Sequence, residues 1–281
     1  MAAFLVFRIV RVRYPQGPLP VFAFLTFLLL PTIVINSAYW GQADVIYTTA
    51  LLACLYFFLT ERPTLAMLAF GLAVSTKLQA IFLAPFLMIL YLNKKTSLAS
   101  FFLVPGVYLA MILPAWFIGR PLPDLLTIYL AQGETYRELT MNAPTLYTWI
   151  PNSLYDIFVP AGLLLTILVA LGLIAAAHKN LAASSNTLIA LATLSVIAMP
   201  FFLPKMHDRY FYPADVFSLV LGFYSPELFF IPLLVQFVSL FAYFPFLFQA
   251  EPVPLEMLAV ILVVTMLLLW RHLRNHRTST W

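Results

Sequence analysis

The chain has 281 residues, of which 63% are hydrophobic and only 9% are charged. Soluble globular domains carry about 25% charged residues, so this composition excludes an ordinary soluble enzyme and predicts a membrane protein with several passes. The net charge of +4 requires no nucleic-acid partner, because an uneven distribution of Lys and Arg across a membrane accounts for it.

The N-terminal residues 1–13 resemble the tail of a helix. Their apolar run is too short for a signal peptide, and Arg8, Arg11 and Arg13 follow it instead of a cleavage site. A membrane-spanning helix needs about 20 apolar residues, or somewhat fewer where protein shields its ends. The sequence therefore predicts an all-α, polytopic transmembrane helical bundle. It forms one transmembrane domain, residues 1–281, with about ten spans near 21–35, 43–60, 64–76, 80–92, 98–118, 157–177, 187–203, 211–224, 228–248 and 254–270.

A polar break, Ser75 to Gln79, divides the apolar stretch 64–92 into two short helices. With this break, the positive-inside rule places most of the basic residues in the cytoplasm, namely Arg8, Arg11, Arg13, Arg62, Lys94, Lys95, Lys179, Arg271, Arg274 and Arg277. The other side receives most of the carboxylates and the remaining cations, namely Lys77, Arg120, Arg137, Lys205 and Arg209. We expect a multi-pass protein of the cell membrane whose polar chemistry lies at the extracytoplasmic face.

The segment Asn36 to Asp44, NSAYWGQAD, follows a predicted span on that side. It is dense in side chains that stack on sugars or hydrogen-bond to them, and Trp40, Gln42 and Asp44 are candidates for contacts with a sugar or an acceptor. Asp44 also begins the next span, where a carboxylate stabilises a helix N-terminus. For Asp44 the capping role and a catalytic role both stay open.

Lys77 stands in the middle of the break, between helices of about 13 residues that reach only roughly 20 Å. Because the hydrocarbon core is about 30 Å thick, we expect the turn below the membrane surface, in a funnel walled by protein. A lysine at that depth is costly unless it meets an anion, and a lipid phosphate is the candidate. Snorkelling of Lys77 to the headgroups is the alternative.

The segment Lys205 to Asp215, KMHDRYFYPAD, lies between two predicted spans on the same side. Lys205, His207 and Arg209 supply cationic donors for an anion, because Arg binds phosphate through a bidentate fork and His changes its charge near neutral pH. The spacing lacks the HExxH form and no second His lies nearby, so the pattern predicts an anion clamp and no metal site. An interfacial belt of Tyr, Lys and Arg is the alternative.

The long loop 119–156 is predicted to be extracytoplasmic. Apolar residues recur at helical spacing from Leu122 to Leu130, which favours an interfacial amphipathic helix. Its later part, MNAPTLYTW, contains Asn142. This loop either covers a site from above or only connects two spans.

Four segments, NSAYWGQAD, STKLQA, NAPTLYTW and KMHDRYFYPAD, together resemble the integral-membrane glycosyltransferases of the GT-C superfamily. The nearest resemblance is to the prokaryotic group related to the GPI mannosyltransferase that adds the second mannose. It runs over nearly the whole chain, and WGQAD and MHDRYFYPAD are its most specific parts.

This resemblance implies a helical bundle with an extracytoplasmic active site that transfers a sugar from a polyprenyl-phosphate carrier. It also implies an aspartate in the first outer loop as catalytic base. That loop is expected upstream of residues 1–13, so the chain resembles the family without its N-terminal portion. A chain lacking that base is expected to be inactive alone, and Asp44 is the one base candidate in view.

We therefore expect a mannosyltransferase-like hexosyltransferase, with Lys77, His207 and Arg209 on the carrier phosphate and Lys205 in support. Trp40, Gln42, Asp44 and Asn142 face the sugar or the acceptor. The expected partners are a polyprenyl-phosphate-linked sugar, membrane lipid and a separate chain that supplies the missing N-terminal helices. No cofactor is predicted, and a divalent metal stays open. The alternatives are a transporter or flippase of lipid-linked sugars and a non-catalytic membrane partner.

Overall fold

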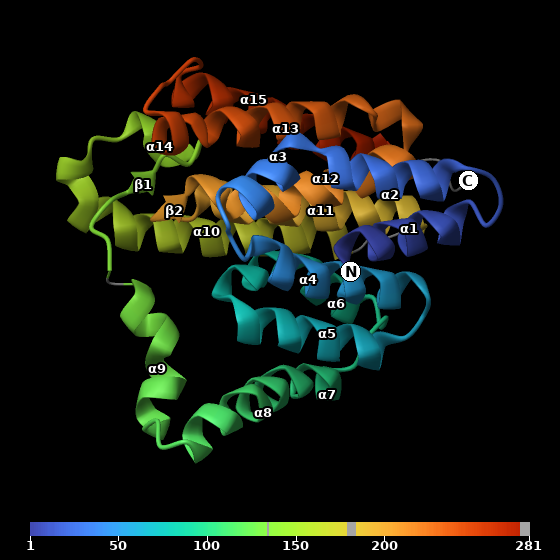
Figure 1. Ribbon diagram of the computed structural model, residues 1–281, viewed down its shortest axis with the longest axis horizontal. Coiled ribbons are helices and arrows are strands. Elements are labelled where there is room, and N and C mark those ends of the chain that lie inside the picture. The colour runs from blue at the N-terminus through green and yellow to red at the C-terminus, as the bar shows by residue number, and fades with distance from the viewer. Residues whose placement is uncertain (134, 179–183, 276–281) are drawn as a thin grey trace.

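The computed structural model describes residues 1–133, 135–178 and 184–275 (Figure 1). Lys179 and Arg277, which the sequence placed on the cytoplasmic side, lie outside the described residues. Helices account for most of the described chain, and the prediction of an all-α bundle is confirmed.

Most consecutive helices are joined by short connections. The first part of the chain forms α1 (Ala2–Arg13), α2 (Leu19–Leu29), α3 (Pro31–Val34), the π-helix η1 (Ile35–Tyr39), α4 (Asp44–Leu59), α5 (Pro63–Thr76), the 3-10 helix η2 (Leu78–Leu83), α6 (Ala84–Leu92), α7 (Leu98–Phe101), α8 (Leu103–Phe117) and α9 (Leu122–Gly133). The second part forms β1 (Thr140–Met141), η3 (Leu146–Trp149), η4 (Asn152–Leu154), α10 (Tyr155–His178), α11 (Ser185–Phe202), β2 (Met206–His207), η5 (Asp208–Phe211), α12 (Tyr212–Tyr224), η6 (Pro226–Leu228), α13 (Phe230–Ala242), α14 (Phe244–Phe248) and α15 (Leu255–Asn275).

Each of the predicted spans is helical, but their lengths differ. Among the described residues, five segments are long and apolar enough to cross a membrane, and the bent pair of α2 with α3–η1 makes a sixth if it counts as one span. The helices α4, α5 and the η2–α6 unit are apolar but shorter. By length, five to six of the described helices qualify as membrane spans, whereas the sequence predicted about ten. The difference comes from the short helices, which cross a membrane only where protein or a thinner bilayer covers their ends.

Two of the apolar helical stretches that the structure describes are interrupted, each for a local reason. Leu30 is extended (φ −61°, ψ 127°) because Pro31 follows it, and α2 and α3 meet there at 50°. The predicted break at Ser75 to Gln79 is confirmed: α5 ends at Thr76, Lys77 is extended (φ −157°, ψ 131°), and η2 begins at Leu78.

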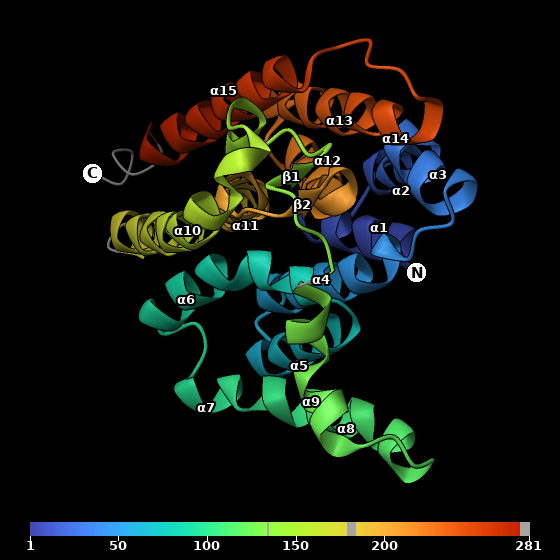
Figure 2. The same cartoon turned by 90° about the vertical axis from the view of Figure 1, so that its left-hand side faces the viewer.

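The bundle is packed around α12, in which almost every residue is buried. α11 and α13 lie beside it, while α8 has no buried residue and diverges with α9 from the body of the molecule (Figures 1 and 2). The helix predicted from Leu122 to Leu130 is present as α9. α8 is joined to the body through α5, where Gly71 faces Val104 and Val107.

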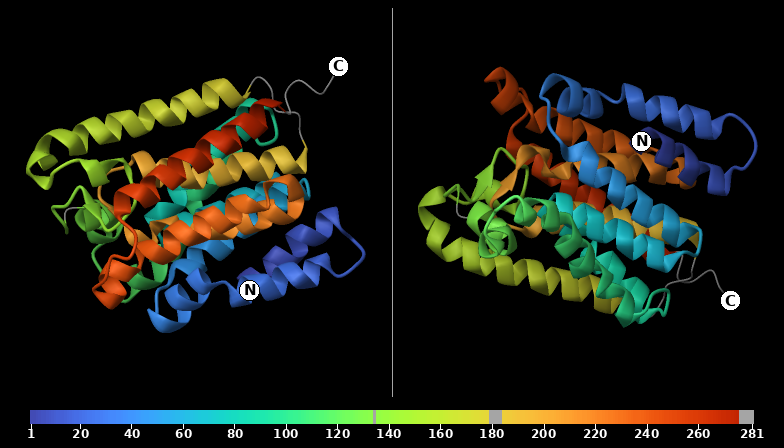
Figure 3. Two further views of the ribbon diagram at one scale, coloured as in Figure 1. Left: turned by 90° about the horizontal axis from the view of Figure 1, so that it is seen from above. Right: turned by 60° about the horizontal axis from the view of Figure 1, so that its bottom comes forward.

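The two ends of the bundle differ. The strands β1 and β2, η5 and the loop after α9 gather at one end, whereas the α1–α2 connection and the last turns of α15 lie at the other (Figures 1 and 3). The strands form a two-stranded parallel pair, with Thr140 opposite Met206 and Met141 opposite His207. No sequence pattern predicted this pair, and it fixes the long loop to the segment before α12.

Candidate functional site

The polar end of the bundle brings together the segments that the sequence singled out. Asp44 begins α4, Lys77 occupies the break between α5 and η2, and Arg209 lies in η5 just before α12. Trp40 follows the π-helix η1, and Asn142 follows β1. Residues from four separate parts of the chain therefore meet at this end.

The centre of this site is a buried ion cluster. Asp44 has no exposed surface, and its carboxylate pairs with Lys77 through Oδ1. Its other oxygen accepts a hydrogen bond from Asn36 Nδ2 at 3.1 Å and lies 4.0 Å from Arg209 Nε. A carboxylate without water needs such partners, because an isolated buried charge is strongly unfavourable. Asp44 thus holds two cations in place.

Aromatic rings surround the two cations. The Lys77 ammonium lies 5.4 Å from the centre of the Tyr47 ring and 5.0 Å from that of Tyr210. The Arg209 guanidinium lies 5.5 Å from the centre of the Trp40 ring. Ring faces attract cations electrostatically, and more strongly where water is excluded. The rings therefore fix the directions of the two cationic side chains.

A cavity of about 620 Å³ opens beside this cluster. Lys205, His207 and Arg209, the three residues of the predicted anion clamp, all line it. Its other lining residues come from η2, α9, the loop after α9, β1, α10 and the segment around β2, and among them Gln79 and Tyr136 add polar groups. The cavity therefore offers two cationic groups, one imidazole and several hydrogen-bonding side chains to a ligand.

The β1–β2 pair positions the imidazole. His207 is paired with Met141 in the parallel ladder and forms a second bridge with Asn142. Both Asn142 (φ 55°) and Lys205 (φ 66°) adopt left-handed backbone conformations, which non-glycine residues rarely do. The backbone is thus held in an uncommon shape on either side of the site, a feature often found at functional positions.

Burial changes the charges at the edge of the cavity. It lowers the pKa of His207 from 6.5 to about 4, with repulsion from Arg209 and Lys77 adding to the effect. It raises the pKa of Asp208 from 3.8 to about 7, although the carboxylate accepts the Arg209 backbone N–H at 2.8 Å. The prediction of His207 as a cationic donor is therefore wrong near pH 7. A neutral imidazole offers one N–H and one lone pair.

The predicted residues fall into two groups. Lys205, His207 and Arg209 line the cavity. Lys77 pairs with Asp44 and does not line the cavity, whereas its neighbour Leu78 does. Lys205 donates a hydrogen bond to the Tyr155 hydroxyl at 2.5 Å.

The predicted sugar contacts lie behind this wall. Trp40 packs against Tyr243 and Phe246, with ring centres 5.4 and 5.1 Å apart, and it does not line the cavity. Gln42 is half-buried, and its backbone N–H donates to Asn36. Trp40 thus supports Arg209 from behind.

Three further contributors were not among the predicted site residues. Asn36 donates to Asp44, Tyr210 contacts both cations, and Tyr136 lies with its ring centre 5.4 Å from that of His207. Tyr210 and Asn36 stand inside the segments that the sequence singled out, so their motifs were the available signal. Tyr136 reaches the site only through the path of the long loop, which no local pattern encodes.

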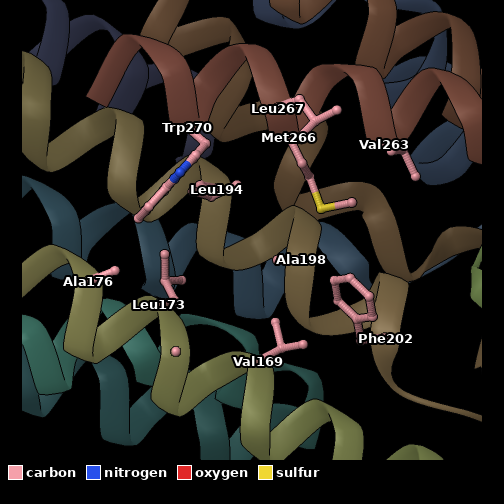
Figure 4. Close-up of a pocket in the computed structure, with 11 residues that line it drawn as sticks. Val169, Leu173, Ala176, Leu194, Ala198, Phe202, Val263, Met266, Leu267 and Trp270 are labelled. Atoms are coloured by element: carbon pink, nitrogen blue, oxygen red, sulfur yellow. The ribbon is translucent and has the colours of Figure 1, made fainter. Parts of the chain in front are cut away.

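A second hollow lies on a different side of α10, between α10, α11 and α15 (Figure 4). Its volume is about 330 Å³, and its wall consists of apolar side chains such as Leu173, Met266 and Trp270. None of the described charged side chains lines this hollow, so it provides no ionic group for a ligand. Among the described residues there is also no group of three or more His, Cys, Asp and Glu side chains that could hold a metal ion.

Comparison with known proteins adds no assignment. Neither a protein-family model nor a curated protein matches this chain.

Proposed function

We propose that the protein is a membrane glycosyltransferase that transfers a sugar from a polyprenyl-phosphate donor. The observation that carries this proposal is the joint position of Lys205, His207 and Arg209 on one cavity of about 620 Å³ at one end of a membrane bundle. A cavity of this size accommodates a sugar, and its cations suit a phosphate group. The resemblance of the site segments to GT-C glycosyltransferases points the same way.

In this proposal Arg209 is the principal phosphate ligand. Its guanidinium is held by Asp44 and by the Trp40 ring, so its donors are already oriented before a ligand arrives. A fixed guanidinium stabilises the negative charge that develops on the leaving phosphate without reorganisation during the reaction. Lys205 adds a second positive charge from the same wall.

The base for the acceptor hydroxyl has two candidates. Asp44 is enclosed behind Lys77 and has no exposed surface, so its present position favours the role of holding the cations. His207 lines the cavity, and its lowered pKa leaves a lone pair available near pH 7. The activities of Asp44→Asn and His207→Gln against pH distinguish the two roles.

The test is sugar transfer by the purified chain in lipid nanodiscs, from a panel of polyprenyl-phosphate sugars to lipid and oligosaccharide acceptors. Binding of the polyprenyl-phosphate carrier is measured in parallel. We expect Arg209→Ala to weaken carrier binding at least roughly tenfold, because hydrogen bonds to charged groups contribute about 1.5–3 kcal/mol. Arg137→Ala is the matched control, since Arg137 pairs with Asp156 on the exposed surface of the same end. Equal binding by both variants would contradict the proposal.

One observation favours a second function, the transport of lipid-linked sugars. Transporters often pair two interrupted membrane helices around their substrate site. The described part of the chain contains two such interruptions, at Leu30 and at Lys77. The two functions separate in proteoliposomes: a transporter moves a labelled lipid-linked sugar between leaflets without consuming it, and a transferase releases polyprenyl phosphate.

A further inference from the structure

A second carboxylate is buried in the bundle, outside the cavity. Asp215 lies in the first turn of the central helix α12 and has no exposed surface. Asp44 is equally buried but pairs with Lys77 and lies near Arg209. None of the ion pairs found among the described residues involves Asp215. Its negative charge therefore needs another compensation.

The hydrogen bonds around Asp215 have a defined direction. Gln236 Nε2 on α13 donates to the Asp215 backbone carbonyl at 3.2 Å, which turns Gln236 Oε1 the other way. Thr32 on α3 donates its hydroxyl proton to that Oε1 atom. The Thr32 hydroxyl also interacts with the Asp215 carboxylate, so its single proton serves two acceptors. One shared proton compensates the buried carboxylate only in part, so negative charge remains to be balanced.

Further oxygen atoms surround the same place. The Ser239 hydroxyl interacts with the carboxylate, and the Tyr243 phenol interacts electrostatically with it. Both carboxylate oxygens of Asp215, Ser239 Oγ and the Tyr243 hydroxyl oxygen are buried without a regular hydrogen bond among the described residues. Buried polar atoms almost always have partners, so several such atoms together indicate an occupant.

The backbone beside Thr32 has the form that membrane proteins use for ions. Thr32 stands between the break at Leu30 and the π-helix η1. π-helices are frequently found at functional sites, and interrupted membrane helices of transporters coordinate small cations.

We propose that Asp215, Thr32 and Ser239, with the Tyr243 hydroxyl, form a binding site for a monovalent alkali-metal cation between α3, α12 and α13. The donors are all oxygen atoms, which suit hard cations. A single carboxylate balances one positive charge, which favours Na⁺ or K⁺ over a divalent ion. A proton on Asp215 is the competing occupant, but one proton satisfies only one of these oxygens.

The experiment measures thermal stability of the purified full chain in detergent, in NaCl, in KCl and in choline chloride at equal ionic strength. A ligand that binds only the folded state stabilises it, and we expect a melting temperature about 5 °C higher in the salt of the bound cation. The preference between NaCl and KCl identifies the ion. Direct binding of radioactive sodium or of rubidium, as a potassium substitute, is the second readout.

Asp215→Asn removes the charge at nearly constant volume, so it should abolish both the cation-dependent shift and the direct binding. Ser239→Ala keeps the charge and removes one ligand, and we expect a smaller shift that needs more salt. Asp124→Asn is the matched control, because Asp124 also lies in the first turn of a helix, α9, but is exposed. It should keep the full shift.

Equal stability of the unmodified chain in all three salts, with no binding of either radioactive ion, overturns the proposal. A shift that survives in both Asp215→Asn and Ser239→Ala overturns it as well, because the cation then binds elsewhere. If pH alone changes the stability and Asp215→Asn removes that change, the occupant is a proton and the proposal is wrong. None of these measurements depends on enzymatic activity, so they are independent of the proposed function.

Discussion

The two hollows along α10 contrast in how they are built. The apolar hollow lies between three long helices, α10, α11 and α15, whose composition alone makes its wall apolar. The polar cavity is walled by short segments, including η2, α9, β2 and η5. An apolar wall in a membrane needs no special partners, whereas a polar wall needs a defined partner for each charge. The polar cavity therefore depends on tertiary contacts that the apolar hollow does not require.

The largest expected effect is on the ion cluster behind the polar cavity. Lys77→Met leaves the Asp44 carboxylate without its direct counter-charge, and removal of one partner from a buried pair costs about 3–5 kcal/mol. We expect a corresponding loss in the free energy of unfolding by denaturant. The double variant Lys77→Met, Asp44→Asn should recover much of it.

The exposed pair of Arg137 and Asp156 is the control for this comparison. Both side chains are about three-quarters exposed, and exposed pairs contribute at most about 1 kcal/mol. Arg137→Met should therefore change stability little. If Lys77→Met is as mild as Arg137→Met, the Asp44 charge is compensated in another way.

The second prediction concerns the place where the long loop reaches α10. A Cβ on Gly162 would lie 2.0 Å from the Tyr147 hydroxyl oxygen, which donates to the Phe202 carbonyl at 2.7 Å. Gly162→Ala should displace Tyr147 and cost about 1–3 kcal/mol, as overpacking does. Limited proteolysis of the loop and thermal unfolding measure the change.

Gly172 on the same helix is the matched control. It lines the apolar hollow, and a Cβ there meets no atom within 4 Å. Gly172→Ala should be neutral or slightly stabilising, because alanine has the higher helix propensity. A larger effect at Gly172 than at Gly162 would reverse the contrast between the two hollows.

The third prediction separates charge from geometry at the polar cavity. Arg209→Lys keeps the positive charge but loses the planar fork and its contact with the Trp40 ring. We expect binding of polyprenyl phosphate to weaken by roughly tenfold, or about 1.4 kcal/mol. Unchanged binding, measured by titration calorimetry, would mean that only the charge of Arg209 matters.

The smallest effect is the pH dependence of the stability of the unmodified chain, to which Asp208 and His207 contribute with opposite signs. Asp208 has a pKa raised from 3.8 to about 7, so its contribution to stability is lost as pH rises through that range. His207 has a pKa lowered from 6.5 to about 4, so its contribution is lost as pH falls through that range. In the unmodified chain the two slopes oppose each other between about pH 4 and 6.5.

Single variants should reveal the two slopes. Relative to the unmodified chain, Asp208→Asn should gain stability as pH rises from about 4 to 7, and His207→Gln should lose it as pH rises from about 4 to 6.5. Melting temperatures in a series of buffers measure both differences. Parallel pH profiles for all three proteins would show that neither pKa is shifted.

Local features of the sequence were sufficient for the helices and for the break in the middle of 64–92. Apolar length gives a membrane helix, and polar residues inside an apolar run mark an interruption. The extent of α9 followed from the spacing of Leu122, Leu126 and Leu130. The bend at Leu30 was missed, although Pro31 was its visible signal.

The site was foreseen as a set of segments and not as a set of contacts. Lys205, His207 and Arg209 lie close in the chain, so their joint position on one cavity follows from one short segment. The partners of Lys77 come from distant segments, and so does Tyr136. Pairings of that kind depend on how helices pack, which composition and spacing do not specify.

The sequence by itself determined that the protein is a helical membrane protein with a polar end, because hydropathy and the distribution of charge are local properties. Only the tertiary structure decided which charges are compensated. Asp44 and Asp215 both stand at or near the start of an apolar helix and look alike in the sequence, yet one meets Lys77 and the other meets hydroxyl groups. In a medium without water, the partner that packing supplies sets the role of a buried charge.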